Sequence, residues 1–155
     1  MATANLGLET INASDYVSPT PINNNMAKID KLGVDYVTEQ GKSGEWWYRK
    51  WKNGRAECGI DAKKFGQQQL GKPSPESTTY MTNRMSFGAY PFAFKAKPFV
   101  CISFEGDSEL ATRGSFCVQQ ADQSPTTVAP LFAIVDWQAG TITPTCGIYV
   151  TGSYK

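Results

Sequence analysis

The sequence predicts a mainly β protein, an antiparallel β-sandwich preceded by a short helical segment. Short runs of β-branched and aromatic residues recur with turn-forming residues about every ten residues, and no helical period separates them. An Asn53-Gly54 pair divides two alternating runs, as in a β-hairpin. One stretch near the N-terminus has apolar residues at helical spacing.

The predicted helix lies in this N-terminal stretch. Thr20 is suited to cap it, Pro21 to occupy its first position and Gly33 to end it. Its apolar stripe consists of Ile22, Met26 and Ile29. Because a helix this short is marginal alone in water, we expect the stripe to pack on the β-domain or on copies of itself around a symmetry axis. The chain then divides into an N-terminal segment, residues 1–41, and a β-domain, residues 42–155.

The strongest local signal is a hairpin over residues 45–65. A two-residue type I′ turn needs positive φ at both central positions, which Asn53 and Gly54 favour. Counting outward from this turn places Lys50 opposite Glu57. One face then collects the residues predicted to be core: Trp47, Trp51, Ala56, Cys58 and Ile60.

The rest of the chain predicts further short strands. They are expected at residues 78–87, 99–104, 115–120, 130–137 and 141–154. A polar loop at 66–77 precedes them. The segment 89–98 carries two prolines that exclude a central strand, so we expect an extended crossover there. The turn Gln138-Ala-Gly140 is expected to close a hairpin between the last two strands.

Composition narrows the function classes. The chain has 15 basic and 14 acidic residues without long runs, so we expect no nucleic-acid partner. It has no histidine, which removes the usual general base near neutral pH. The cysteines lack metal-binding spacing, so we expect buried free thiols and neither metal nor cofactor: Cys58, Cys101, Cys117 and Cys146. Without a signal peptide or apolar span, we expect cytoplasmic synthesis and no membrane insertion.

Exposed aromatic residues are the candidate ligand contacts, because carbohydrate sites combine aromatic faces with planar polar groups. The predicted register places Trp46 and Tyr48 on the polar face of the hairpin, where they contact either a ligand or a neighbouring subunit. Trp137, between Asp136 and Gln138, either contacts a ligand or packs at a strand end. We predict no catalytic residue and no metal ligand.

Several segments carry a family resemblance. The motifs Asn5-Leu-Gly-Leu8, Asp15-Tyr-Val17 and Asn23-Asn-Asn-Met-Ala-Lys-Ile-Asp30 resemble the opening of phage and prophage tail-fibre or baseplate proteins of Gram-positive hosts. The hairpin Trp47–Cys58 is similar to one that opens the C-terminal tip domain of such proteins. The segment Tyr90–Val100 resembles the Pro-Phe segment before the next core strand of that domain.

The resemblance implies a homotrimeric virion protein of a tail fibre or baseplate. Its N-terminal segment would dock to other tail or baseplate proteins, and its β-domain would attach to a host cell-surface glycan or protein. The resemblance implies no cofactor and no catalytic residues. Two alternatives stay open: a purely structural fibre or head-decoration protein, and an enzyme such as a glycan depolymerase that uses two carboxylates.

Overall fold

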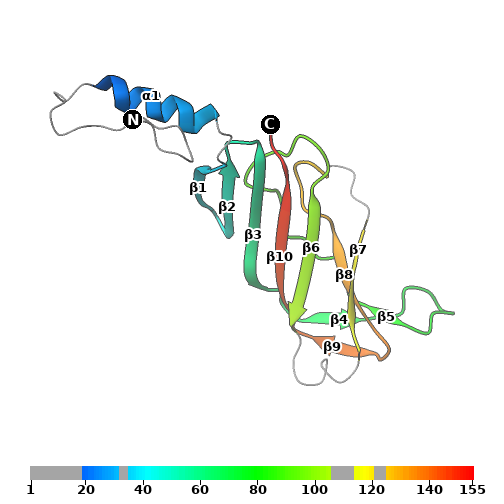
Figure 1. The fold of residues 1–155 in the computed structure, drawn as a ribbon. Helices are drawn as coiled ribbons and strands as arrows, with labels where there is room; N and C mark the ends of the chain where they lie inside the picture. Colours follow the sequence, from blue (N-terminus) through cyan, green and yellow to red (C-terminus); the bar gives the residue numbers. More distant parts are fainter. Residues whose placement is uncertain (1–18, 32–34, 106–113, 121–124) are drawn as a thin grey trace. The chain divides into compact units, whose positions relative to one another are not determined.

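The computed structural model describes residues 19–31, 35–105, 114–120 and 125–155. These residues form one helix and a set of antiparallel sheets, which confirms the predicted mainly β fold (Figure 1). The chain divides into two compact units, residues 1–36 and 37–155. The boundary predicted at residue 41 therefore falls inside the first strand, β1 (Val37–Ser43). We call residues 37–155 the β-domain.

The first unit contains the helix α1 (Pro19–Lys31). It begins at Pro19, where a proline is favourable because the first helical N–H has no partner within the helix. The prediction that Thr20 caps the helix and that Pro21 is its first residue is therefore wrong, since both lie inside the helix. In the apolar stripe, Ile22 and Met26 are exposed. The predicted helix end at Gly33 lies outside the described residues.

The larger sheet has five strands in the order β1-β2-β3-β10-β6, all antiparallel. The other four strands are β2 (Trp46–Trp51), β3 (Arg55–Lys64), β6 (Phe99–Glu105) and β10 (Thr145–Ser153). The last strand of the chain, β10, lies between β3 and β6 (Figure 1). The edge strand β1 was not predicted, because its sequence is polar and all seven of its residues are exposed.

Two smaller sheets complete the β-domain. One pairs β4 (Gln68–Leu70) with β9 (Gly140–Ile142), and the other has β8 (Phe132–Asp136) between β5 (Tyr80–Met81) and β7 (Phe116–Gln119). The predicted strand at 78–87 is thus much shorter. The hairpin predicted across residues 138–140 is wrong, since β8 pairs with neither β9 nor β10. Pro144, which has no N–H for a ladder, separates β9 from β10.

One core cluster joins the large sheet to the two smaller ones, the arrangement of a sandwich. The rings of Phe65, Phe87 and Phe132 lie 5.1–5.4 Å apart between their centroids. Buried residues of this cluster come from β3, β4, β8, β9 and β10: Ala56, Cys58, Ile60, Leu70, Phe132, Ile134, Ile142, Cys146, Ile148 and Val150. The core thus fixes both layers of the sandwich through apolar contact.

The β2–β3 hairpin turns at the predicted place but has a different register. Lys50 pairs with Ala56, not with Glu57. Gly54 has a φ of +90°, whereas Asn53 has no positive φ. The N–H of Gly54 donates to the carbonyl of the residue that ends β2, at 3.1 Å. These features define a three-residue loop, in which a type I turn is followed by a glycine bulge.

The shift of one residue reverses the two faces of β2. Trp46 is only 6% exposed and belongs to the core, whereas Trp47 and Trp51 are partly exposed on the outer face. The core prediction is wrong for Trp47 and Trp51. On β3 it is confirmed, since Ala56, Cys58 and Ile60 are buried. Because β2 carries aromatic residues on both faces, alternation alone does not choose between them.

The four cysteines are free thiols, as predicted. Burial raises the pKa of Cys58 and of Cys146 to about 12, so both stay protonated at neutral pH. Cys117 is half-buried. The predicted burial is wrong for Cys101, which is exposed because it points outward from the edge strand β6.

Candidate functional site

The outer face of the large sheet carries aromatic and charged side chains in adjacent rows. Trp47 pairs with Gly59 and Gly59 with Tyr149, which makes one row. Arg49, Glu57 and Thr151 make the next row in the same way. We call this surface the sheet platform: Trp47, Arg49, Trp51, Arg55, Glu57, Gly59, Asp61, Tyr149 and Thr151.

The indole of Trp47 is held in one position on this platform. It lies over Gly59, where an added Cβ would come 2.8 Å from Trp47 Cζ2 and 2.6 Å from the carbonyl oxygen of Ile148. Its Nε1–H donates to Asp61 Oδ1 at 2.8 Å. The ring of Tyr149 lies beside it, with 6.1 Å between centroids. The indole is therefore held in place by three contacts: the backbone at Gly59, the carboxylate of Asp61 and the ring of Tyr149.

Charged groups surround these rings. The hydroxyl of Tyr149 donates to Glu57 Oε2 at 2.6 Å, and Arg49 Nη1 lies 3.7 Å from Glu57 Oε1. The hydrogen bond to Glu57, together with burial, raises the pKa of Tyr149, so its hydroxyl remains a donor at neutral pH. The guanidinium of Arg55 lies 5.5 Å from the ring of Trp51. The platform thus offers carboxylate acceptors and guanidinium donors next to aromatic faces.

Two of the predicted site residues lie against the interior. Trp46 packs edge-on against Tyr90, with 5.6 Å between ring centroids. Tyr48 packs in the same manner on Phe92, at 6.0 Å, and its hydroxyl donates to Glu39 Oε1 at 3.1 Å. The predicted solvent exposure is wrong for Trp46, and Tyr48 is half-buried. The cause is the register of the hairpin, which exchanges the two faces of β2.

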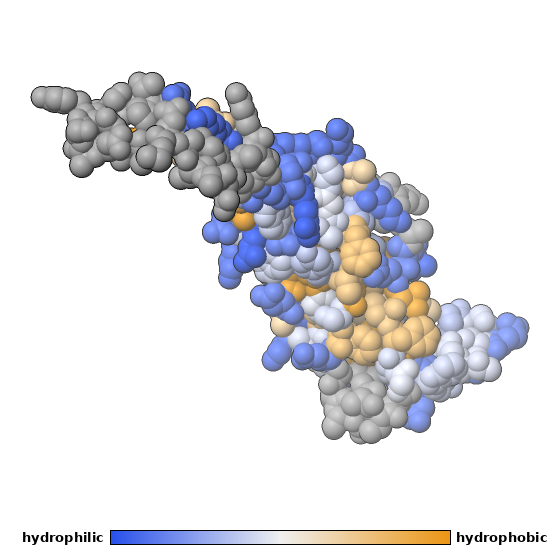
Figure 2. All heavy atoms as spheres, viewed as in Figure 1, coloured by the Kyte–Doolittle hydropathy of each residue, from blue (hydrophilic) through white to orange (hydrophobic). Residues whose placement is uncertain are grey.

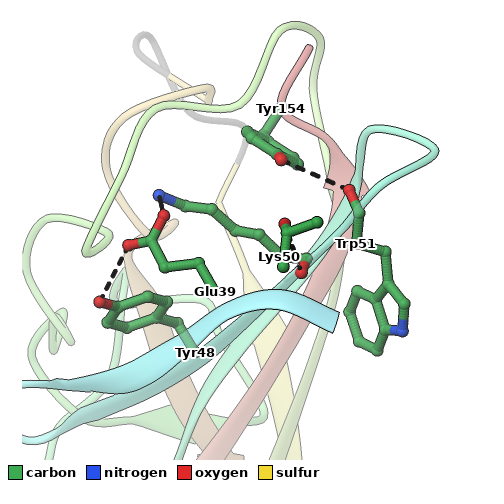
Figure 3. Close-up of polar contacts among 6 residues, drawn as sticks. Glu39, Tyr48, Lys50, Trp51 and Tyr154 are labelled. Atoms are coloured by element: carbon green, nitrogen blue, oxygen red, sulfur yellow. Dashed lines mark hydrogen bonds and ion pairs between the residues drawn. The ribbon is translucent and has the colours of Figure 1, made fainter. Parts of the chain in front are cut away.

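Lys50 shares this inward face and is accommodated by its neighbours (Figure 3). Its Nζ lies 2.9 Å from Glu39 Oε2 and 5.0–5.6 Å from the ring centroids of Tyr48, Phe92 and Tyr154. A cation near aromatic faces is attracted by their quadrupoles. The hydrogen bonds from Lys50 and Tyr48 lower the pKa of Glu39. This cluster ties the edge strand β1 to β2 and to the C-terminal residues.

The other predicted residues, Asp136, Trp137 and Gln138, lie at the end of β8 and directly after it. Asp136 is fully buried and accepts hydrogen bonds from the Ser115 hydroxyl, at 2.7 Å, and from the Gln138 N–H, at 2.8 Å. Its carboxylate therefore stabilises the turn after β8 and is not accessible to a ligand from solvent. Trp137 is 56% exposed and Gln138 is also at the surface. These two remain available for a contact.

A recess lies between the start of β6 and the end of β7, and we call it the β6–β7 pocket. Its volume is about 300 Å³. Its walls are formed by Tyr90, Lys97, Pro98, Phe99, Val100, Gln119, Gln120, Pro125 and Pro130. Phe99 stands at its rim and is 67% exposed. None of the described residues that line this pocket is acidic.

Hydrophobic surface gathers over β7 and the neighbouring part of β6 (Figure 2). On β7 and at the start of β8, Phe116, Val118 and Leu131 are each at least 40% exposed. We call these three residues the apolar patch. The strand β7 is an edge strand and contains no charged residue. Natural edge strands are usually protected by charges or proline, so an edge of this kind is typical of a covered surface.

Within the described ranges, no group of three or more cysteine, aspartate or glutamate residues is placed to hold a metal ion. No helix among these residues is long and apolar enough to cross a membrane. No family model matches the chain, and no characterised protein or solved structure matches it. Two sources therefore support a proposal of function: the described surface and the resemblance of the sequence motifs.

Sequence analysis did not select Trp47, Asp61 and Tyr149 as site residues, and it placed Trp47 in the core. The sequence feature that could have indicated these residues is Gly59. Glycine is uncommon in the interior of a strand, where it often marks a close approach of other atoms. In the structure that approach is made by the ring of Trp47.

Proposed function

We propose that the protein is a virion attachment protein of a phage tail fibre or baseplate, and that its sheet platform binds a host cell-surface glycan. The observation that supports this proposal most is the fixed indole of Trp47, which lies over Gly59 and is bonded to Asp61. A sugar ring has an apolar face of C–H groups that packs on an aromatic ring. Because the indole is already ordered, binding loses little side-chain entropy.

The polar groups of the platform suit sugar hydroxyls, which both donate and accept hydrogen bonds. The exposed carboxylate of Asp61 accepts, and the exposed guanidinium groups of Arg49 and Arg55 donate. The buried carboxylate of Glu57 holds Tyr149 and Arg49 in place. An open sheet face fits an extended polysaccharide better than an isolated small molecule. Binding by one subunit is expected to be weak, and linked copies strengthen it by roughly 10² to 10⁴.

The apolar patch supports a homotrimer, which the resemblance to tail-fibre proteins also implies. A threefold axis generates head-to-tail interfaces, in which the patch would pack against another surface of the next subunit. An uncharged patch is buried there without the cost of desolvating a charge. The exposed Ile22 and Met26 of α1 provide a docking stripe for another tail or baseplate protein. These surfaces are also what a purely structural fibre or head-decoration protein requires, and that function is the second candidate. We propose no catalytic role.

The test compares adsorption of the full-length protein to susceptible cells for the wild type and for Trp47→Ala. A buried or ordered aromatic at the centre of an interface contributes about 2 kcal/mol, which is roughly 30-fold in Kd. We expect a loss of that size for Trp47→Ala, and little change for Trp137→Ala, which removes an exposed indole from a different surface. A wild type that binds neither cells nor a glycan array would favour the structural alternative.

A further inference from the structure

The β6–β7 pocket lies next to the sheet platform. Phe99, at the pocket rim, is paired with Thr151, which belongs to the platform row of Arg49 and Glu57. A glycan chain that crosses β3 and β10 along this row reaches β6 at Phe99. The pocket is therefore placed to receive a sugar unit of the same chain, beyond the residues that the platform contacts.

The pocket combines apolar walls with few polar groups. Three prolines and the ring of Phe99 supply the apolar surface. The ammonium of Lys97 and the carboxamides of Gln119 and Gln120 supply the polar groups. Small-molecule sites usually measure about 300 to 1,000 Å³, so a pocket of about 300 Å³ suits one sugar unit and not a longer segment.

Charge decides the kind of sugar. Lys97 is exposed, and in the described part of the chain it forms no ion pair. Because none of the described lining residues is acidic, no described carboxylate compensates the positive charge of Lys97 in the pocket. A ligand with an anionic group would gain a charge-assisted hydrogen bond that a neutral sugar cannot form.

We propose that the β6–β7 pocket binds a sugar unit that carries an anionic group, either a carboxylate or a phosphate. Lys97 pairs with the anionic group, the carboxamides of Gln119 and Gln120 bond to hydroxyls, and Phe99 packs on the C–H face of the ring. This inference rests on the proposed function, because it specifies the class of glycan that the platform holds.

The test titrates the full-length protein with three probes, glucose, glucuronic acid and glucose 6-phosphate, followed by NMR. We expect at least one of the two anions to bind about tenfold more tightly than glucose, because a hydrogen bond between charged groups is stronger than a neutral one. The anion that binds more tightly identifies the group. Equal dissociation constants for all three probes would overturn the inference.

Two lysine variants localise the effect. Lys97→Gln is expected to remove the preference for the anion and to leave the glucose affinity unchanged. Lys95→Gln, which removes a nearby exposed charge outside the pocket lining, is expected to retain the preference. Retention of the preference in Lys97→Gln, or its loss in Lys95→Gln, would assign the charge effect to another surface and overturn the inference.

The results for the pocket and for the platform are separable. If Trp47→Ala abolishes adsorption while the wild type shows no preference for an anion, the proposed function stands and the pocket inference falls. If Lys97→Gln removes an anion preference while Trp47→Ala adsorbs normally, the pocket inference stands and the platform is not the attachment site.

Discussion

Trp47 and Gly59 face each other across the β2–β3 pairing, and the indole occupies the space that a side chain at residue 59 would need. The backbone beneath is equally close, since the carbonyl oxygen of Ile148 lies 2.6 Å from the position of such a Cβ. The two residues therefore determine the surface together: glycine permits the indole to lie flat on the sheet, and the indole covers the glycine.

Gly59→Ala is expected to destabilise the β-domain by about 1–3 kcal/mol, because the added methyl group overpacks a buried site. It should also displace the indole and weaken cell adsorption. Urea unfolding followed by tryptophan fluorescence measures the first effect. Gly66→Ala is the matched control, since a Cβ at residue 66 meets nothing within 4 Å. Equal stability of the two variants would show that the sheet adapts at residue 59.

The Glu39 cluster predicts a dependence of stability on pH. Hydrogen bonds from Lys50 and Tyr48 lower the pKa of Glu39 below its ordinary value of 4.5. A carboxylate with a lowered pKa in the folded state stabilises the fold above its unfolded pKa, and this contribution is lost as pH falls through the folded pKa. We therefore expect the wild type to exceed Glu39→Gln in stability at pH 7 and to lose that advantage at an acidic pH below the lowered pKa of Glu39. Urea midpoints at both pH values measure it, and an advantage that is independent of pH would contradict the prediction.

The apolar patch predicts the oligomeric state. Light scattering should give about three times the chain mass of 17.0 kDa for the wild type. Val118→Glu places a charge in the apolar patch, where burial in a subunit interface would cost free energy, and should yield a folded monomer. Gln67→Glu adds the same charge at an exposed loop position and should remain trimeric. If light scattering gives the mass of a monomer for the wild type, the proposed homotrimer is wrong.

The sequence predicts the class of fold and the position of the hairpin because both depend on local chemistry. Asn53-Gly54 marks a turn in any register, whereas the register depends on one dihedral angle: Asn53 has no positive φ, so the loop has three residues. The aromatic residues of β2 occur on both faces, and Lys50, which alternation places outside, is held inside by Glu39 and three rings. Contacts between residues this far apart in the sequence cannot be predicted from the alternation of apolar and polar residues along one strand.

The candidate site could be predicted from the sequence only in part, for the same reason. Trp137, predicted either to contact a ligand or to pack at a strand end, is exposed. The burial of Asp136 was not foreseen, because its partner Ser115 precedes β7 and is distant in the sequence. The β6–β7 pocket likewise combines residues from segments near positions 90–100 and 119–130, which only the folded chain brings together.

The two adjacent tryptophans of β2 offer the sharpest separation of fold from function. Trp46 is buried against Tyr90, so Trp46→Ala should cost about 3–5 kcal/mol, a large share of the stability of a small domain. Because that variant can fail to fold, Trp46→Phe is the milder substitution and should lower the urea midpoint by less. Trp47 lies on the outer face, so Trp47→Ala should cost less stability than Trp46→Ala.

Adsorption is expected to follow the opposite order. Folded Trp46→Phe should adsorb to cells as the wild type does, since the buried ring touches no ligand, whereas Trp47→Ala should lose adsorption while its circular dichroism spectrum stays unchanged. Measuring both quantities on both variants distinguishes the observed register from the predicted one, in which the two residues exchange roles. If Trp47→Ala unfolds the domain and Trp46→Phe abolishes adsorption without loss of stability, the binding surface lies on the inward face of β2, and the platform is not the attachment site.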